Sequence, residues 1–379
     1  MGRSGVSGVP RVGLIVNPIA GMGGRVGLKG TDGVDAVERA RELGAEPVAP
    51  DRTRVALENL LENIGGPIEI VTFSGVMGAD VCRACGIDPI EVGGPRIALT
   101  EPEDTRRAGR ELLDYGIDLL LFAGGDGTAR DLHEVVGTSI PVLGVPTGVK
   151  MHSSVFATTP RAAGELAAHF LASAGQPCRE SEVMDIDEDA FRQGRVSARL
   201  YGYLSVPFER GLVQSLKGGS GATGETDLAG IASDIAERMR DSALWVLGPG
   251  TTTRSIAELL GVRKTLLGVD CYAFGEVVAL DATEQDILKL LDGVPARIVV
   301  TPIGGQGYIF GRGNQQISPA VIRRVGKENV VIVAANAKLV GLQGKPLLVD
   351  TGDPDLDAEL AGYVRVVTGY HQESMQRVA

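Results

Sequence analysis

The sequence is poor in aromatic residues, cysteine and long apolar runs, and basic residues are outnumbered. Aromatics make up 4% of its 379 residues, and 37 Lys and Arg face 48 Asp and Glu, a net charge of -11. A chain this acidic does not attract polyanions, which argues against nucleic acid or an anionic membrane as partners. The first apolar run, 12–16, is too short for a signal peptide, and no run approaches the ~18 residues of a membrane span. We therefore expect a cytoplasmic protein.

Cysteine is too scarce to indicate a disulfide framework. Only Cys82 and Cys85 are closely spaced, and Cys178 and Cys271 do not form the second half of a zinc site. We expect free thiols in a reducing compartment.

Glycine, by contrast, is abundant, with 53 of 379 residues, about twice the usual share of ~7%. The glycines alternate with runs of Val, Ile and Leu, which is typical of tight strand-to-helix turns. In the first third, short apolar runs alternate with amphipathic segments, a pattern that predicts βαβ units and a parallel sheet.

These patterns predict an α/β fold. We expect an N-terminal Rossmann-like doubly wound parallel sheet, then a second α+β domain with antiparallel strands and an additional α/β unit. The expected domains are 1–148, 149–335 and a C-terminal segment 336–379 that returns to the first domain. Strands are expected at 12–16, 68–73, 118–123, 140–145, 183–186, 195–206, 244–247, 265–269, 298–301, 330–334 and 363–367. Helices are expected at 34–43, 103–115, 129–136, 159–173, 253–260 and 284–291, and a loop at 218–224.

Residues Gly124-Gly125-Asp126-Gly127-Thr128 follow the apolar run 118–123 and carry the clearest chemical signal. Glycines at the carboxyl end of a buried strand let backbone N–H groups approach an anion, as in a phosphate site. A carboxylate beside phosphates needs a role of its own. Asp126 could hold Mg²⁺ or accept the proton of an attacking hydroxyl. The alternative is a plain turn with Thr128 as helix cap.

The motif 124–128 resembles the GGDGT signature shared by NAD kinases and diacylglycerol kinases. The segment 13–18, with the nearby glycines, is similar to the start of the same group. The segments 144–153 and 304–316 look like the ATP-NAD kinase branch that includes the X protein of acetoin-catabolism clusters.

This resemblance implies a kinase that transfers phosphate from ATP, or polyphosphate, with Mg²⁺, to the 2'-hydroxyl of NAD. It gives Asp126 the role of catalytic base and implies nucleotide substrates and a homo-oligomer. The expected nucleotide- or phosphate-binding residues here are Asn17, Gly21, Gly23, Gly24, Gly124, Gly125, Gly127 and Thr128, although the first glycine turn taken alone is often just a tight turn. The Asn-Glu or Asn-Asp pair that binds NAD ribose in typical members is absent after Thr128. The acceptor could therefore be a sugar, a polyol or an acetoin-related compound, or the protein could be a non-catalytic nucleotide sensor.

A second strand-to-helix turn follows 244–247 and predicts another phosphate site, unless its threonines only cap the helix. Its residues are Gly248, Gly250, Thr251, Thr252 and Thr253. The remaining candidates for a substrate cleft are Thr147, Lys150, His152, Asp270, Gly305, Gln306, Arg312 and Asn314. For His152 a buried structural role is the alternative, for Asp270 a solvated strand end, and for the glycine-rich turns around 308–310 a bulge or hairpin corner.

Overall fold

The computed structural model describes residues 9–28, 34–95, 100–149, 151–173, 177–186, 198–209, 212–213, 225–265, 267–303 and 306–379. Its backbone forms two compact units, Met1–Met22 with Glu46–Gln214 and Gly23–Ala45 with Ser215–Ala379. These divisions differ from the expected boundaries at 148 and 335, because the strand pair that follows the first sheet packs within the first unit. No helix of the described residues has the length and apolar content to span a membrane.

The first unit is built on a five-stranded, all-parallel sheet of order β3-β2-β1-β4-β5. Its strands are β1 (Arg11–Val16), β2 (Glu69–Phe73), β3 (Ile90–Gly93), β4 (Leu119–Gly124) and β5 (Val142–Pro146). Its helices are α2 (Ala49–Asn63), α3 (Ala79–Ala84), α4 (Pro102–Tyr115), α5 (Asp126–Val136) and α6 (Pro160–Ala172). An antiparallel pair, β6 (Cys178–Ile186) and β7 (Ala198–Pro207), completes it.

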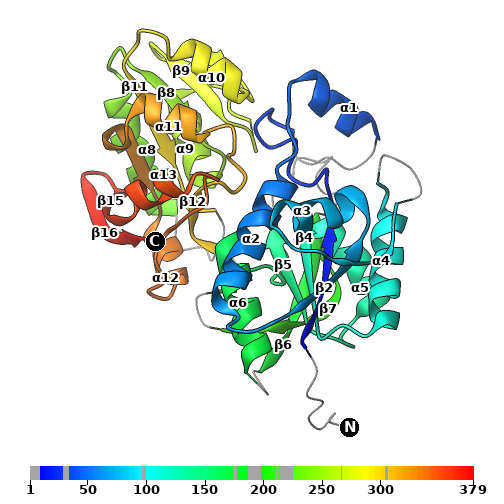
Figure 1. Ribbon diagram of the computed structural model, residues 1–379. Coiled ribbons are helices and arrows are strands. Elements are labelled where there is room, and N and C mark those ends of the chain that lie inside the picture. The colour runs from blue at the N-terminus through cyan, green and yellow to red at the C-terminus, as the bar shows by residue number, and fades with distance from the viewer. Residues whose placement is uncertain are drawn as a thin grey trace. The chain divides into compact units, whose positions relative to one another are not determined.

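Helices cover both faces of this sheet. α2 packs with α6, and α4 packs with α5, on opposite sides of the strands (Figure 1). β4 is consequently buried along its whole length, which explains why its sequence is an uninterrupted apolar run. At the start of α6, the Thr159 side chain accepts a hydrogen bond from the Ala162 N–H, and Pro160 takes the first turn, as the sequence predicts.

The second unit contains a mixed seven-stranded sheet of order β10-β9-β8-β11-β13-β15-β16. These strands are β8 (Leu244–Leu247), β9 (Asp270–Ala273), β10 (Glu276–Ala279), β11 (Ala296–Val300), β13 (Val330–Val333), β15 (Gly362–Gly369) and β16 (Gln372–Val378). A small parallel pair joins β12 (Tyr308–Phe310) and β14 (Leu348–Val349). The helices are α1 (Val34–Glu42), α8 (Glu225–Arg238), α9 (Thr251–Leu260), α10 (Glu284–Leu290), α11 (Pro319–Val325), α12 (Asn336–Gly341) and α13 (Pro354–Leu360).

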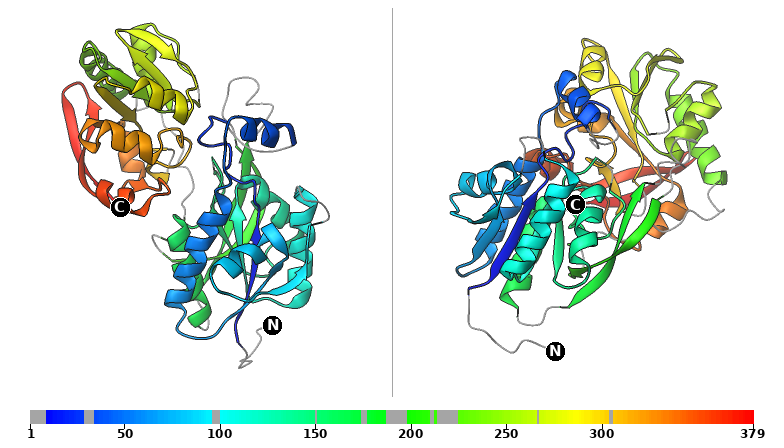
Figure 2. Two further views of the ribbon diagram at one scale, coloured as in Figure 1. Left: turned by 45° about the horizontal axis from the view of Figure 1, so that its top comes forward. Right: turned by 90° about the vertical axis from the view of Figure 1, so that its right-hand side faces the viewer.

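The α/β class with a parallel N-terminal sheet and a mixed C-terminal sheet is confirmed, but several details of the expectation differ. The prediction omits β3, α2, α3 and α8. The segment 336–379 supplies β15 and β16 to the second sheet (red in Figure 2). The strand expected at 265–269 is wrong, because β9 begins only at Asp270 and runs antiparallel to β8. α5 begins at Asp126 and not at 129, because Gly125 is its N-cap. The loop expected at 218–224 lies outside the described residues.

Candidate functional site

The carboxyl edge of the first sheet brings several predicted residues together. The strand order reverses between β1 and β4, the point where doubly wound sheets leave a crevice for ligands. Asn17 directly follows β1, and its side-chain amide donates to Thr128 Oγ1 at 3.0 Å, across that point. Thr147 directly follows β5, and its N–H donates to the Gly124 carbonyl at 3.1 Å. The predicted cluster at this edge is therefore formed by three parallel strands.

Asp126 is the first residue of α5 and is 5% exposed. Its Oδ2 accepts the His152 backbone N–H at 2.6 Å and lies 3.2 Å from His152 Nδ1. Its Oδ1 accepts the Ser153 backbone N–H at 3.0 Å. The N-terminus of α5 favours the negative charge. The carboxylate thus fixes the segment 151–153 against the start of α5.

A carboxylate offers about four lone-pair positions, two on each oxygen. In Asp126, Oδ2 has two contacts within the described part of the chain and Oδ1 has one. One acceptor position on Oδ1 is therefore available to a ligand hydroxyl. His152, expected to contact the acceptor, instead contacts Asp126 with both its backbone N–H and its ring.

Thr147 carries a buried polar atom without a partner. The residue is 4% exposed, and among the described residues nothing hydrogen-bonds its Oγ1. A buried hydroxyl without a hydrogen bond is unfavourable by about 1–3 kcal/mol, so this position suits a polar ligand atom or water. Gly21, with φ of 76°, lies against the same residue, and a Cβ there would stand 1.9 Å from the Thr147 carbonyl oxygen.

Arg52 is a cation at this edge that the sequence analysis does not identify. It lies on α2, and its Nε donates to the carbonyl of Pro146, the last residue of β5. A guanidinium has five N–H donors and is suited to phosphate oxygens. No sequence signal distinguishes this arginine from others on amphipathic helices, because the contact joins residues 94 positions apart.

Other expected site residues lie in the second unit. Gly23 and Gly24 belong to that unit, and Gly24 approaches the Gln315 side chain. Gln306, just before β12, is half-buried. Lys150 and Gly305 lie outside the described residues.

Asp270, expected to meet a ribose hydroxyl, is fully buried. Lys264 Nζ donates to its Oδ2 at 2.9 Å, and further donors come from Thr265 and the Asp281 N–H. These bonds use the acceptor positions of the carboxylate, so Asp270 holds the turn before β9 in place and is not part of the proposed site.

Arg312 and Asn314 also serve the local fold. Arg312 forms a buried ion pair with Asp350 at 2.8 Å and stacks over the Tyr308 ring. The Asn314 amide bonds the Ile309 carbonyl and the Gly311 N–H, closing the turn after β12. The hairpin-corner interpretation of this segment fits these contacts.

At the second predicted phosphate turn, the three threonines differ. Thr251 is exposed, whereas Thr252 and Thr253 are buried. Thr253 Oγ1 donates to the Gly248 carbonyl at 2.7 Å and therefore closes the turn. Thr252 Oγ1 accepts from Thr301 Oγ1, directly after β11, at 3.4 Å.

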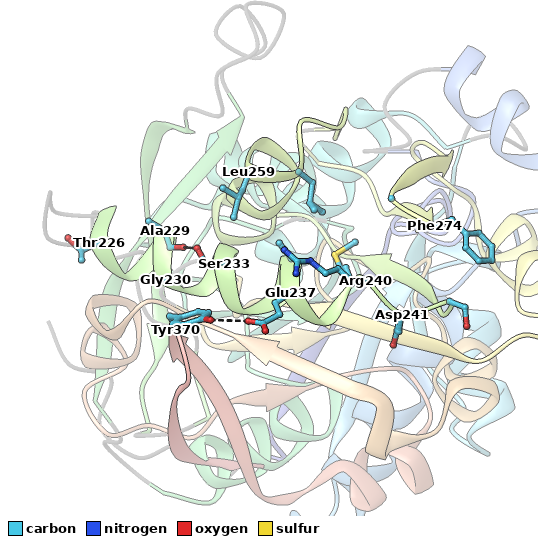
Figure 3. A pocket seen from close by; sticks show the side chains of 15 residues that line it. Thr226, Ala229, Gly230, Ser233, Glu237, Arg240, Asp241, Leu259, Phe274 and Tyr370 are labelled. Atoms are coloured by element: carbon cyan, nitrogen blue, oxygen red, sulfur yellow. Dashed lines mark hydrogen bonds between the residues drawn. The ribbon is translucent and has the colours of Figure 1, made fainter.

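A cavity of about 1210 Å³ lies elsewhere in the second unit, along α8 (Figure 3). Its lining includes Leu259, Phe274 and Tyr370, whose hydroxyl donates to Glu237 at 3.0 Å. None of the predicted site residues lines it. Among the described residues, no group of three His, Cys, Asp or Glu side chains is placed to hold a metal ion.

Comparison with known families gives two matches. The ATP-NAD kinase N-terminal domain matches residues 12–174, and the ATP-NAD kinase C-terminal domain matches residues 241–378. The first match contains the carboxyl-edge cluster around Asp126, and the second contains α9. No curated protein matches the chain.

Proposed function

Because the chain belongs to the ATP-NAD kinase family, we propose that it transfers the terminal phosphoryl group of ATP to the 2'-hydroxyl of NAD, giving NADP. The family implies a kinase with ATP as donor and nucleotides as substrates. NAD as the acceptor, and polyphosphate as a second possible donor, belong to the proposal. The observation that carries it is the buried carboxylate of Asp126, held at the carboxyl edge of β4 with one acceptor position left on Oδ1.

In the proposed reaction, the acceptor hydroxyl donates its hydrogen bond to Asp126 Oδ1. As the hydroxyl oxygen forms its bond to the γ-phosphorus, the bond to the ADP oxygen breaks and the proton passes to the carboxylate. The N–H groups of His152 and Ser153 hold the carboxylate in one orientation. Rate enhancement then comes chiefly from positioning and charge neutralisation.

The phosphate groups would lie at the N-terminus of α5, where helix N–H groups favour an anion. Thr147 Oγ1 supplies a hydroxyl without another partner, and Arg52 supplies a guanidinium at the end of β5. Among the described residues no group of three His, Cys, Asp or Glu side chains is placed to hold a metal ion. We propose that Mg²⁺ enters with the phosphates of ATP, and Asp126 is the residue that would contact it.

Two specific observations favour alternatives. The missing Asn-Glu or Asn-Asp pair favours another hydroxylated acceptor, such as the sugar, polyol or acetoin-related compound that the acetoin branch would imply. The internal hydrogen bonds of Asp126 favour a nucleotide sensor in which this carboxylate only fixes the segment 151–153.

One experiment separates the NAD kinase, the kinase for another acceptor and the nucleotide sensor. The full chain is incubated with Mg-ATP, or polyphosphate, and a panel of NAD, NADH, sugars, polyols and acetoin, and phosphorylated products are identified by mass spectrometry. NADP formation supports the proposal, and a different product identifies the alternative kinase. Nucleotide binding by calorimetry without any product supports the sensor and contradicts the kinase.

A further inference from the structure

His152 contacts Asp126 with only one of its two ring nitrogens. Nδ1 lies 3.2 Å from Asp126 Oδ2, and the His152 and Asp126 side chains are 6% and 4% exposed. The two carboxylate oxygens also accept the backbone N–H groups of His152 and Ser153. Because the carboxylate is the acceptor in these contacts, the proton of the ring contact is assigned to Nδ1.

The second ring nitrogen of His152 is left without a donor. In a neutral imidazole that carries its proton on Nδ1, Nε2 is an acceptor. His152 Nε2 makes no hydrogen bond within the part of the chain that the structure describes. An acceptor on a side chain this buried is unfavourable unless a ligand or a water molecule donates to it.

The segment that carries His152 is also fixed by β6. Ser153 Oγ donates to the Met184 carbonyl at 2.8 Å and accepts the Met184 N–H at 2.9 Å. The Ser154 N–H donates to the Glu182 carbonyl at 3.0 Å. The carboxylate therefore holds the imidazole ring while β6 holds the backbone beside it, so Nε2 keeps one position. A group fixed in this way binds a ligand with little further loss of conformational entropy.

Two acceptor atoms are therefore available at neighbouring points. Asp126 Oδ1 has one acceptor position left, and His152 Nε2 lies on the far edge of a ring that contacts the same carboxylate. A single hydroxyl has one proton and can donate to only one of the two atoms. Two hydroxyls on adjacent carbon atoms can donate to both.

We propose that His152 selects acceptor substrates with a vicinal diol, such as ribose. One hydroxyl donates to Asp126 Oδ1 and is phosphorylated, and the adjacent hydroxyl donates to His152 Nε2 and keeps its proton. The inference rests on the proposed function, since it adds to the reaction at Asp126 the residue that recognises the acceptor. NAD, sugars and polyols fit this pair of acceptors. Acetoin does not, because the group beside its hydroxyl is a carbonyl without a proton to donate.

The test compares NAD with the analogue of NAD that lacks the 3'-hydroxyl of the adenosine ribose. We would measure kcat/KM for both compounds with Mg-ATP, in the wild type and in His152→Asn. Asparagine keeps an N–H donor at the position of Nδ1 and has no atom at the position of Nε2. The wild type should use NAD about tenfold better than the analogue, the size of one buried hydrogen bond. His152→Asn should bring this ratio to about one by lowering kcat/KM for NAD.

Two further variants separate recognition from structure, with folding checked by circular dichroism. His152→Gln places an amide oxygen near the position of Nε2 and should restore part of the ratio. His169→Asn is the matched control, because His169 Nδ1 also contacts a carboxylate, Glu209 Oε2 at 2.9 Å, but this pair is exposed on the surface. It should keep the tenfold ratio. A purely structural role of His152 would lower kcat/KM for both compounds equally and leave the ratio unchanged.

The outcomes distinguish this inference from the proposed function. A wild-type ratio near one, or a tenfold ratio retained in folded His152→Asn, overturns the inference while NADP formation still supports the kinase. Calorimetric Kd values for the same two compounds are measured in parallel. If no NADP forms but the wild type binds NAD tenfold more tightly than the analogue and His152→Asn does not, the kinase fails and recognition of the diol stands. Absence of binding of either compound overturns both.

Discussion

Replacing Asp126 by asparagine tests whether the carboxylate both fixes the segment 151–153 and takes part in phosphoryl transfer. The carboxylate accepts two backbone N–H groups, from His152 at 2.6 Å and Ser153 at 3.0 Å. Asparagine keeps one oxygen for one of them and presents its own N–H group to the other. A hydrogen bond to a charged group contributes about 1.5–3 kcal/mol and a neutral one about 0.5–1.5 kcal/mol. Losing one and weakening the other should therefore lower the free energy of unfolding by about 2–4 kcal/mol.

In calorimetry this loss should lower Tm by about 5–15 °C for the transition of the first unit, at roughly 2–4 °C per kcal/mol. Turnover, measured at a temperature where the variant remains folded, should fall by about 10²–10⁴-fold if Asp126 is the base. Asp114→Asn, exposed on α4, is the matched control for charge loss and should change neither quantity. A Tm equal to that of the wild type would show that the hydrogen bonds from the His152 and Ser153 N–H groups to Asp126 are not made in solution. Turnover close to wild type would remove Asp126 from the mechanism.

Three further predictions concern the rest of the chain. Lys264→Met should lower the free energy of unfolding, measured in urea, by about 3–5 kcal/mol, because it leaves Asp270 charged and buried without its ion pair. An unchanged urea midpoint would show that the Lys264–Asp270 ion pair does not stabilise the protein. Burial raises the pKa of the Cys82 thiol to about 12, so at pH 8 a thiol reagent should modify the exposed Cys178 well before Cys82, as followed by mass spectrometry. The Arg323 guanidinium on α11 lowers the pKa of Asp353 from its ordinary value of 3.8 to about 2. The stabilising contribution of the ionised Asp353 carboxylate should therefore be complete above pH ~4 and lost as the pH falls towards 2. Acid titration of the Asp353 carboxyl by NMR can check the pKa.

Local patterns predicted four strands of the first sheet and missed β3. The uninterrupted apolar run of β4 is buried on both faces, and the glycines after it mark where the strand passes into α5. Since the carboxyl ends of parallel strands lie on one edge, the sequence pattern places Asn17 and Thr128 near one another, and their side chains do bond. The N-cap at Thr159 could likewise be predicted, because it depends only on neighbours three residues apart.

The prediction of a strand at 265–269 was wrong for a physical reason that the sequence does not display. Asp270 is charged, so hydrophobic patterning alone predicts that it lies at a solvated strand end. Its burial depends on Lys264 and on the Asp281 N–H, and these contacts place the start of β9 at Asp270 itself. Ion pairs inside a protein have no periodicity, so hydrophobic patterning cannot predict them.

The amino-acid order by itself determined the α/β class, the glycine-rich turn at 124–128 and its place at the end of a buried strand, since these depend on periodicity and on short-range backbone geometry. Only the tertiary structure decided what those side chains meet. It placed the N–H groups of His152 and Ser153 on Asp126 and Lys338 beside Thr301. Such pairings depend on how distant strand ends converge, and no local interaction along the chain specifies that convergence.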